Sequence, residues 1–471
     1  MDLLNKAKYK AIHFVGIKGV GMTALAVLAK QMGITVTGSD VAEEFVTEAT
    51  LKQFDIEYKN GFAGGNIPKQ CDLVIYTGAH GGSKNSEVFE AKLRNIPVMP
   101  HGRALGMFME GKRSISVSGS HGKTTTAAMI TFILTSAGLD PSFAVGCGEI
   151  LNLHTPAREG NGEWFVAEAD EYVTDPGVDP TPRFLWQKPE YLVITNIDYD
   201  HPDVYPNLKS IQDTFVVFSQ KISENGTVIL NLDDPASQGV MTQIARPIVT
   251  YGTAKDAEFR IDKVTFKQGQ THFEVYARKK KLGSFTLRIP GLHNVHNATA
   301  AIAMLTAVGL SVSQIKAGLN QFAGTKRRFE YIALYWDKLL FDDYAHHPAE
   351  ISATLTAARK WYPKKRIIAI FQPHTYSRTQ ALQTEFASCF ETADEVLITE
   401  IYASARETVI PGISGKSLWR AVTKHKKSAY YAPNKRDVLE YISTQTRSND
   451  LIITMGAGDI FTWLPEITKA L

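Results

Sequence analysis

The sequence predicts an α/β protein of three domains with largely parallel sheets. Three observations lead to this fold class. Short apolar runs typical of strands alternate with helical stretches along the chain. Glycine-rich loops stand between a strand and the helix that follows it. A length of 471 residues also allows two to four domains, each with its own core. Because strand–helix–strand units cross over in one hand, parallel sheets are expected.

The first domain is predicted at residues 1–111 and is Rossmann-like. Strands at Ala11–Ile17, Ile34–Gly38 and Asp72–Thr77 surround a helix at Met22–Met32. This order is a βαβ unit. A new strand then starts after Gly111.

The central domain is predicted at residues 112–324 and resembles a P-loop ATPase. A strand at Arg113–Ser118 leads through a glycine-rich turn into a helix at Thr124–Ala137, which Gly138 stops. Further strands are predicted at Trp164–Ala169, Tyr191–Asn196 and Gly226–Asn231. Antiparallel hairpins follow at residues 257–290, and a helix at Asn297–Val308.

The third domain is predicted at residues 325–471 and repeats the Rossmann-like α/β rhythm. Its strands stand at Leu339–Asp343, Arg366–Gln372, Val396–Ile401 and Leu451–Met455, with helices between them. The chain shows no internal repeat, low-complexity tract or long linker.

Composition excludes several classes of protein. The 44% hydrophobic and 21% charged residues are ordinary for a globular chain. The net charge of +3 argues neither for nor against nucleic acid, but no basic stripe is interleaved with aromatics, so we expect no nucleic-acid partner. Cys71, Cys147 and Cys389 lie far apart, which suggests free thiols in a reducing compartment. No apolar run approaches about eighteen residues, so we expect no signal peptide or membrane span, and a cytoplasmic protein.

The glycine-rich turn of the central domain carries the clearest chemistry. Its backbone N–H groups and the dipole of the next helix can hold a phosphate chain. Lys123 would reach the outer phosphates and the Thr124 hydroxyl would ligate magnesium. Val117 stands where the standard P-loop has its first glycine, so the turn is shorter. A plain loop is the alternative, but the flanking strand and helix favour a nucleoside-triphosphate site.

A second glycine-rich loop follows the first strand and half-matches a dinucleotide fingerprint. It contains Gly16, Gly19 and Gly21, but Lys18 occupies the position of the second glycine. Asp40 follows the second strand, where an acid can bind a ribose. On these residues alone the loop could bind a dinucleotide or serve only as a tight packing turn.

Acidic clusters follow two strands of the central domain. Glu168, Asp170 and Glu171 stand where parallel sheets bind ligands, and with Thr124 they suit oxygen-coordinated magnesium. The alternative is a solvated loop. The next strand leads to His201 among three acids, and this histidine could ligate a second metal, orient an acid or be structural.

Two strand ends of the third domain carry histidines. Residues 342–348 contain His346, and residues 371–378 contain His374 and Arg378. If these ends converge, they would bind an anion such as a carboxylate. The alternative is a set of surface or capping residues.

Taken in order, these segments resemble the Mur ligases, the ATP-dependent amide-forming enzymes of peptidoglycan synthesis, over essentially the whole chain. The chain is similar to the branch that joins L-alanine to UDP-N-acetylmuramate. The motifs that carry the resemblance stand at Gly119–Thr125, Glu168–Glu171, Thr195–His201, His293–Asn297, Gly324–Phe329, Asp342–Pro348, Phe371–His374 and Gly456–Asp459.

The resemblance implies a role for each site. The catalytic residues would be Lys123, His201 and His346. Magnesium would be held by Thr124 and Glu168, with His201 at a second metal. ATP would be bound by Gly119, Ser120, His121, Gly122, Lys123, Thr124, Thr125, Asn294, Asn297, Arg328 and Asp343. The nucleotide sugar and the amino acid would be bound by Gly16, Lys18, Gly19, Gly21, Asp40, His80, Asp170, Glu171, Asn196, Tyr344, His374 and Arg378.

The resemblance also implies the reaction and the partners. The lactyl carboxylate of UDP-N-acetylmuramate would be phosphorylated by ATP, and L-alanine would attack the acyl phosphate. The protein would be a monomer or a weak homodimer. Many members carry a carbamylated lysine, but Asp213–Val216 has none at that place, which fits the alanine-adding branch. Lys18, Leu292 and the segment Thr174–Arg183 depart from the family pattern.

Three other functions compete with this one. A recycling ligase would attach a murein tripeptide to the same nucleotide sugar, but the sequence around His374 argues for the alanine branch. An NAD-dependent oxidoreductase built on the first domain is disfavoured by Lys18 and by the second nucleotide loop. A non-catalytic nucleotide-binding protein is disfavoured by Lys123, Glu168 and His201.

Overall fold

The computed structural model describes residues 8–199, 204–267, 269–403 and 408–471. The chain divides into two compact units. The first comprises Met1–Val264, Phe273–Leu287 and Asn294–Thr325, and the second comprises Thr265–His272, Arg288–His293 and Lys326–Leu471.

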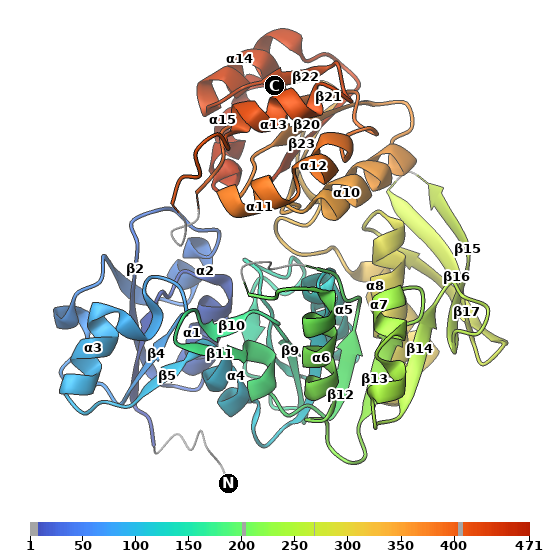
Figure 1. Ribbon diagram of the computed structural model, residues 1–471. Coiled ribbons are helices and arrows are strands. Elements are labelled where there is room, and N and C mark those ends of the chain that lie inside the picture. The colour runs from blue at the N-terminus through green and yellow to red at the C-terminus, as the bar shows by residue number, and fades with distance from the viewer. Residues whose placement is uncertain (1–7, 200–203, 268, 404–407) are drawn as a thin grey trace. The chain divides into compact units, whose positions relative to one another are not determined.

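The N-terminal part of the first unit is a five-stranded parallel sheet in the order β3-β2-β1-β4-β5. It is drawn in blue in Figure 1. Its strands are β1 Ala11–Val15, β2 Thr35–Asp40, β3 Glu57–Asn60, β4 Leu73–Tyr76 and β5 Val98–Pro100. Its helices are α1 Val20–Gln31, α2 Glu48–Gln53, α3 Ser86–Leu93 and α4 His101–Met109. The order changes direction between β1 and β4, which is where ligands bind in such sheets.

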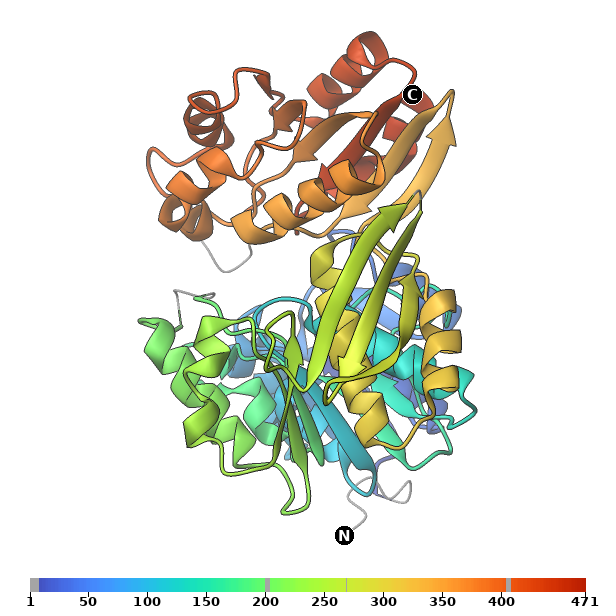
Figure 2. The ribbon, with the colours of Figure 1, turned by 90° about the vertical axis from the view of Figure 1, so that its right-hand side faces the viewer.

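The central sheet has ten strands among the described residues, in the order β17-β16-β15-β14-β13-β12-β6-β9-β7-β8. Its strands are β6 Arg113–Ser118, β7 Ser142–Ala144, β8 Ala157–Arg158, β9 Trp164–Glu168, β12 Tyr191–Ile194, β13 Thr227–Asn231, β14 Ile248–Gly252, β15 Phe259–Lys267, β16 Gln270–Ala277 and β17 Lys280–Leu287. Its helices are α5 Lys123–Ser136, α6 Leu208–Ser219, α7 Pro235–Gln238, α8 Leu292–Ala307 and α9 Val312–Gln321. Figure 2 shows β15 to β17 as long yellow-green strands.

A separate antiparallel hairpin lies between β9 and β12. Its strands are β10 Val173–Asp175 and β11 Asp179–Pro182, and a short 3-10 helix, η3 Arg183–Trp186, follows. Two glycines of α4 allow η3 to pack closely on that helix. A Cβ at Gly102 would lie 3.1 Å from Cα of Arg183, and one at Gly106 would lie 2.3 Å from the Trp186 carbonyl oxygen.

Apolar packing joins the N-terminal and central parts of the first unit. Leu25 and Leu28 of α1 belong to the same buried cluster as Ala144 of β7 and Ala157 of β8. Burial of such side chains contributes about 25 cal/mol per Å² of apolar surface. This packing fixes the glycine loop before α1 relative to the central sheet.

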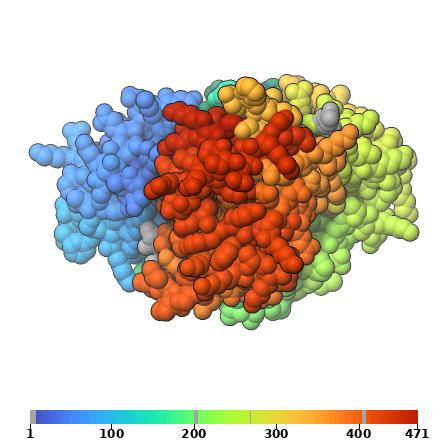
Figure 3. Space-filling model, turned by 90° about the horizontal axis from the view of Figure 1, so that it is seen from above, coloured from blue at the N-terminus to red at the C-terminus, as the bar shows by residue number. Residues whose placement is uncertain are grey.

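The second unit holds a six-stranded sheet in the order β18-β19-β23-β20-β21-β22, parallel except for β18. Its strands are β18 Glu330–Tyr335, β19 Lys338–Asp343, β20 Arg366–Phe371, β21 Glu395–Ile398, β22 Ala429–Tyr431 and β23 Asp450–Met455. Its helices are α10 Pro348–Trp361, α11 Tyr376–Ala381, α12 Gln383–Ser388, α13 Gly415–Val422, α14 Lys435–Gln445 and α15 Leu464–Ala470. Its surface is orange to red in Figure 3.

The predicted fold class, a three-domain α/β protein with parallel sheets, is confirmed. The residue boundaries of the three domains stay predictions. Several element limits differ by a few residues from the sequence analysis, and two of these differences bear on the site. Strand β2 continues to Asp40, and helix α8 begins at Leu292, not at Asn297. Among the described residues, no helix combines the length and apolar character that crossing a membrane needs.

Candidate active site

The glycine-rich turn between β6 and α5 has a backbone that only glycine allows at two places. Gly119 has φ +125° and Gly122 has φ +84°. A Cβ at Gly119 would lie 2.1 Å from the Thr195 hydroxyl. Asn196, at the end of β12, accepts from the His121 N–H at 2.9 Å and donates to the His121 carbonyl at 2.8 Å. The turn is therefore held in shape before any phosphate arrives.

Lys123 is buried at the start of α5 and paired with an acid. Its Nζ lies 2.9 Å from Oε2 of Glu171 and donates to the Gly119 carbonyl at 2.6 Å. Burial disfavours the ammonium form, but the carboxylates of Glu171, Asp170 and Glu168 outweigh this effect and raise the pKa of Lys123. The lysine therefore stays cationic inside the loop.

Thr124 and Glu168 form the candidate cation site. The Thr124 hydroxyl donates to the two carboxylate oxygens of Glu168 at 3.0 and 3.1 Å, and the Gly146 N–H donates to Oε2 at 2.9 Å. Glu168 is the last residue of β9, and Thr124 lies in the first turn of α5, the helix that follows β6. Strands β6 and β9 are neighbours in the sheet. A hydroxyl and a carboxylate are hard oxygen ligands of the kind that Mg²⁺ prefers, so these residues fit the ion.

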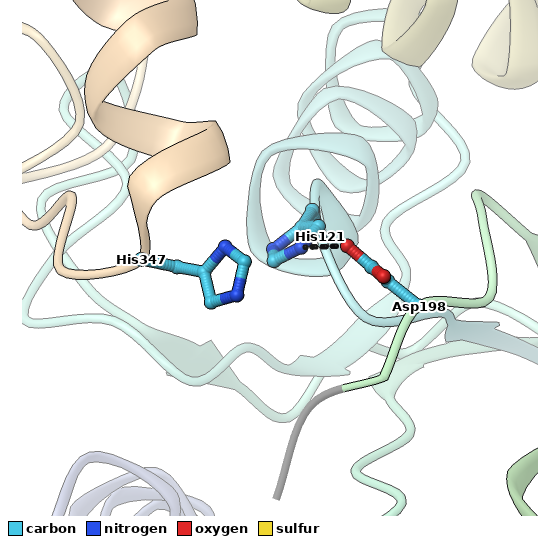
Figure 4. A group of neighbouring side chains, drawn as sticks. All are labelled: His121, Asp198 and His347. Atoms are coloured by element: carbon cyan, nitrogen blue, oxygen red, sulfur yellow. Dashed lines mark hydrogen bonds and ion pairs between the residues drawn. The ribbon is translucent and has the colours of Figure 1, made fainter. Parts of the chain in front are cut away.

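His121 and Asp198 are a second pair at the turn. Nε2 of His121 lies 3.3 Å from Oδ2 of Asp198 (Figure 4). His347, also drawn in Figure 4, belongs to the second unit, where its side chain caps the N-terminus of α10. His201, predicted as a metal ligand and catalytic residue, lies outside the described residues.

Helix α8 brings asparagines to the same turn. Nδ2 of Asn297 donates to Oδ1 of Asn294 at 3.1 Å, and a Cβ at Gly122 would lie 2.4 Å from Oδ1 of Asn297. The first turns of α8 therefore contact the phosphate turn. Asn294 belongs to the helix because α8 begins at Leu292, five residues before the start that its apolar pattern predicts.

The first glycine loop, Asp40 and His80 come together at the carboxyl ends of β1, β2 and β4. Asp40 accepts from the Lys18 N–H at 2.7 Å, and Nε2 of His80 lies 3.5 Å from its other oxygen. Burial raises the pKa of Asp40, and the hydrogen bonds from the backbone of Lys18 and Val41 act against this rise. Gly16 contacts Thr77, where a Cβ would lie 2.3 Å from Cγ2.

The side chain of Lys18 is buried, and its amine is bonded to groups other than Asp40. Its Nζ pairs with Glu48 at 2.7 Å and donates to the Glu43 carbonyl at 2.9 Å, and it lies 5.1 Å from the ring centroid of Tyr58. The predicted contact of Lys18 with a pyrophosphate stays a prediction, and the structure gives its amine another set of partners.

In the second unit, Asp343 and its neighbours gather at the end of β19. Asp343 accepts from the N–H groups of Phe329 and Ala345 at 2.8 and 2.7 Å. Burial raises the pKa of Asp343 to about 6, with Arg328 acting in the opposite direction. The guanidinium of Arg328 lies 5.1 Å from the ring centroid of Tyr344.

The two predicted histidines of this unit lie near each other. The rings of His346 and His374 are 6.3 Å apart between centroids, at nearly a right angle. His374 follows β20, which lies two strands from β19 with β23 between them. Arg378 stands in α11, four residues beyond His374, with its N–H on the Thr375 hydroxyl. The predicted convergence of the two strand ends is therefore present for the histidines.

Sequence reasoning overlooked two arginines. Arg327 is 5% exposed, donates to Asp342 at 2.9 Å and contacts the carbonyls of Gly456 and Gly458. The double arginine at 327–328 is the only signal for it, and it does not say which arginine is buried. Arg183 is paired with Asp170 at 2.8 Å. It ends the segment Thr174–Arg183, which departs from the family pattern, but nothing within that segment singles out the arginine.

Three family profiles match successive parts of the chain: the Mur ligase family, catalytic domain, at residues 11–113, the Mur ligase middle domain at 117–305, and the Mur ligase, glutamate ligase domain, at 327–458. Together they span most of its length. The chain belongs to the Mur ligase family.

Two curated relatives resemble this Mur ligase over nearly its full length, and both are named UDP-N-acetylmuramate–L-alanine ligase. The protein of Desulfitobacterium hafniense is 41% identical over 451 residues, 96% of this chain and 97% of the relative. That of Caldanaerobacter subterraneus is 40% identical over 463 residues, 96% of each.

Two solved structures share this fold. A UDP-N-acetylmuramate-alanine ligase from Thermotoga maritima matches with a TM-score of 0.83 and 28% identity, covering 98% of both chains. A murein peptide ligase from Psychrobacter arcticus matches with a TM-score of 0.72 and 27% identity, covering 98% of both.

Proposed function

We propose that this Mur ligase joins L-alanine to UDP-N-acetylmuramate at the expense of ATP, a step of peptidoglycan precursor synthesis. The observation that carries the proposal is the phosphate turn, in which Lys123 and the Thr124–Glu168 pair stand together. The shared name of the curated relatives, over nearly the whole chain, supports the choice of L-alanine.

The chemistry is activation of a carboxylate. The lactyl carboxylate of the sugar attacks the γ-phosphorus of ATP, ADP leaves, and an acyl phosphate forms. The neutral amine of L-alanine attacks the acyl carbon and loses a proton, and inorganic phosphate leaves. The bond from the γ-phosphorus to ADP is thus replaced by a bond to the carboxylate oxygen, and the acyl C–O bond is then replaced by the amide C–N bond. No covalent bond to the protein is required.

The chain's own residues supply charge and orientation for these steps. Lys123 would neutralise the outer phosphates, and the turn from Gly119 to Thr125 would hold the phosphate chain. Asn294 and Asn297 would support ATP from α8, and Arg328 and Asp343 from the second unit. Thr124 and Glu168 would hold Mg²⁺, which stabilises charge on transferring phosphoryl groups when bound.

The remaining predicted residues would bind the other substrates. The loop with Gly16, Gly19 and Gly21 would hold the diphosphate of the nucleotide sugar, with Asp40 and His80 beside it. His346, His374 and Arg378 would face the amino acid. His346 is suited to take a proton from the amine, because Nδ1 lies 3.0 Å from the Tyr344 carbonyl and the lone pair then sits on Nε2.

One assay tests the proposal against its competitors. Phosphate release from ATP is measured with UDP-N-acetylmuramate plus L-alanine, with the nucleotide sugar plus the murein tripeptide L-alanyl-γ-D-glutamyl-diaminopimelate, and with neither. Turnover with L-alanine alone as acceptor supports the proposal. Turnover only with the tripeptide would assign the chain to the recycling ligases, and no substrate-dependent turnover would contradict both.

A further inference from the structure

Arg183 ends the unusual segment Thr174–Arg183 and packs against Gly102, near the start of α4. The hairpin before it is tied to the N-terminal part of the unit. The Ser83 N–H donates to Asp175 at 2.9 Å, and a Cβ at Gly78 would lie 2.6 Å from the Thr174 carbonyl. Gly78 comes two residues after β4, so the hairpin lies at the carboxyl edge of the first sheet.

The backbone of Arg183 is fixed from several sides. Its N–H donates to the Tyr172 carbonyl at 2.9 Å, and Gly102 of α4 packs directly on its Cα. Trp186, later in η3, donates from its indole to the Thr174 hydroxyl at 2.9 Å. The chain therefore positions Arg183 firmly before a ligand binds, which reduces the ordering cost that binding would otherwise carry.

The guanidinium of Arg183 is only partly satisfied. Nη1 pairs with Asp170 at 2.8 Å, and the guanidinium carbon lies 5.4 Å from the ring centroid of Tyr172. Nε and Nη2 are buried and have no hydrogen-bond partner among the described residues. A buried donor without a partner destabilises the structure, and more so in a charged group. These two nitrogens are the pair that can grip both oxygens of a carboxylate or phosphate.

His101 connects this guanidinium to the glycine loop. A Cβ at Gly21 would lie 2.6 Å from Nε2 of His101, so the ring contacts the backbone at the start of α1. Burial, together with the nearby charge of Arg183, lowers the pKa of His101 to about 4. Its Nδ1 is a second buried atom without a partner among the described residues. Two polar groups with buried atoms that lack a described partner thus lie close together near the start of α1.

We propose that Arg183 binds an anionic oxygen pair of the nucleotide sugar, with Asp170 holding the guanidinium in place. The inference rests on the proposed function, since it concerns the substrate of that site. The chemistry that Nε and Nη2 recognise is a planar or tetrahedral oxyanion. The nucleotide sugar offers two such groups, the diphosphate and the lactyl carboxylate.

Arg158 provides a matched control within the same unit. It also pairs with an aspartate, Asp140 at 3.2 Å, lies 5.5 Å from the ring centroid of Phe143, and has a buried Nε without a described partner. However, it belongs to β8 and donates from Nη2 to the Thr135 hydroxyl, which leaves no pair of neighbouring nitrogens for a ligand. Loss of Arg158 should therefore affect stability without affecting substrate affinity.

The experiment is calorimetric binding to the full chain without ATP. UDP-N-acetylmuramate and UDP-N-acetylglucosamine, which lacks the lactyl group, are titrated into wild type, Arg183→Gln, Arg183→Lys and Arg158→Gln. We expect Arg183→Gln to weaken binding of UDP-N-acetylmuramate about tenfold to a hundredfold, Arg183→Lys less, and Arg158→Gln not at all. A loss for both nucleotides identifies the diphosphate, and a loss for UDP-N-acetylmuramate alone identifies the carboxylate.

Melting temperatures separate binding from folding. Arg183→Gln affinity equal to wild type would overturn the inference while leaving the proposed function intact. A parallel affinity loss in Arg183→Gln and Arg158→Gln, with equally lowered melting temperatures, would also overturn it, since the role of Arg183 would then be structural. Failure of wild type to bind UDP-N-acetylmuramate would instead overturn the proposed function.

Discussion

Lys123 neutralises the buried carboxylate of Glu171 and, in the proposed function, the phosphates of ATP. A test of the second role has to be separated from the first. Nζ of Lys123 lies 2.9 Å from Glu171, and the two side chains are only 13% and 2% exposed. Replacing Lys123 by methionine keeps the length of the side chain and removes its charge. Glu171 would then be a buried carboxylate without its counter-charge, which costs about 3–5 kcal/mol. Lost activity in this single variant could therefore reflect lost stability.

The double variant Lys123→Met/Glu171→Gln removes both charges of the pair. We expect the single variant to melt well below wild type and the double variant to recover most of that difference. We expect both to lose ligase turnover by about 10² to 10³, the usual effect of removing one preorganised group that stabilises transition-state charge. The assay is phosphate release at saturating substrates, with a thermal melt of each protein.

Lys112→Met is the matched control. Lys112 also donates to backbone carbonyls, those of Gly160 and Gly162 at 2.6 and 2.8 Å, but it lies away from the phosphate turn at the start of β6. The Lys112→Met protein should be less stable than wild type and should keep the wild-type turnover number. A double variant that melts like wild type and turns over within tenfold of it would refute the role of Lys123. A double variant that stays as unstable as Lys123→Met would show that the unpaired carboxylate of Glu171 is not the cause of the lost stability.

Three further predictions concern the other sites. Glu168→Gln should raise the magnesium concentration needed for half-maximal activity, with rescue at high magnesium, because one anionic ligand is lost; a titration that superimposes on wild type would contradict this. Arg378→Lys should raise KM for L-alanine about tenfold to a hundredfold and leave KM for ATP unchanged, since lysine cannot grip both carboxylate oxygens; movement of the ATP constant alone would reassign Arg378. Burial raises the pKa of Asp343 from 3.8 to about 6, so between these values the native state holds a proton that the unfolded state has lost. Wild type should therefore lose about 3 kcal/mol of stability relative to Asp343→Asn as pH rises from about 3 to 7, through both pKa values. Melting temperatures of both proteins across this range check it, and a constant difference would show that Asp343 titrates normally.

Local sequence was sufficient for much of the fold and of the phosphate site. Strand β6, the turn with Gly119 and Gly122, and helix α5 follow from residues adjacent in the chain, because a glycine-rich turn between a strand and a helix is a local structure. Thr124 and Glu168 could be paired in advance, since each lies at the carboxyl end of a predicted parallel strand. The alternation of strands and helices likewise predicted the parallel sheets.

Only the tertiary structure decided which charges meet. The sequence does not indicate that Lys123 pairs with Glu171, that the side chain of Lys18 pairs with Glu48, or that Arg183 packs against Gly102 of α4. Each of these contacts joins residues far apart in the chain, and each depends on how one packed layer is placed on another. Periodicity predicts the buried face of an element, but strand register and helix packing determine which side chains that face contacts.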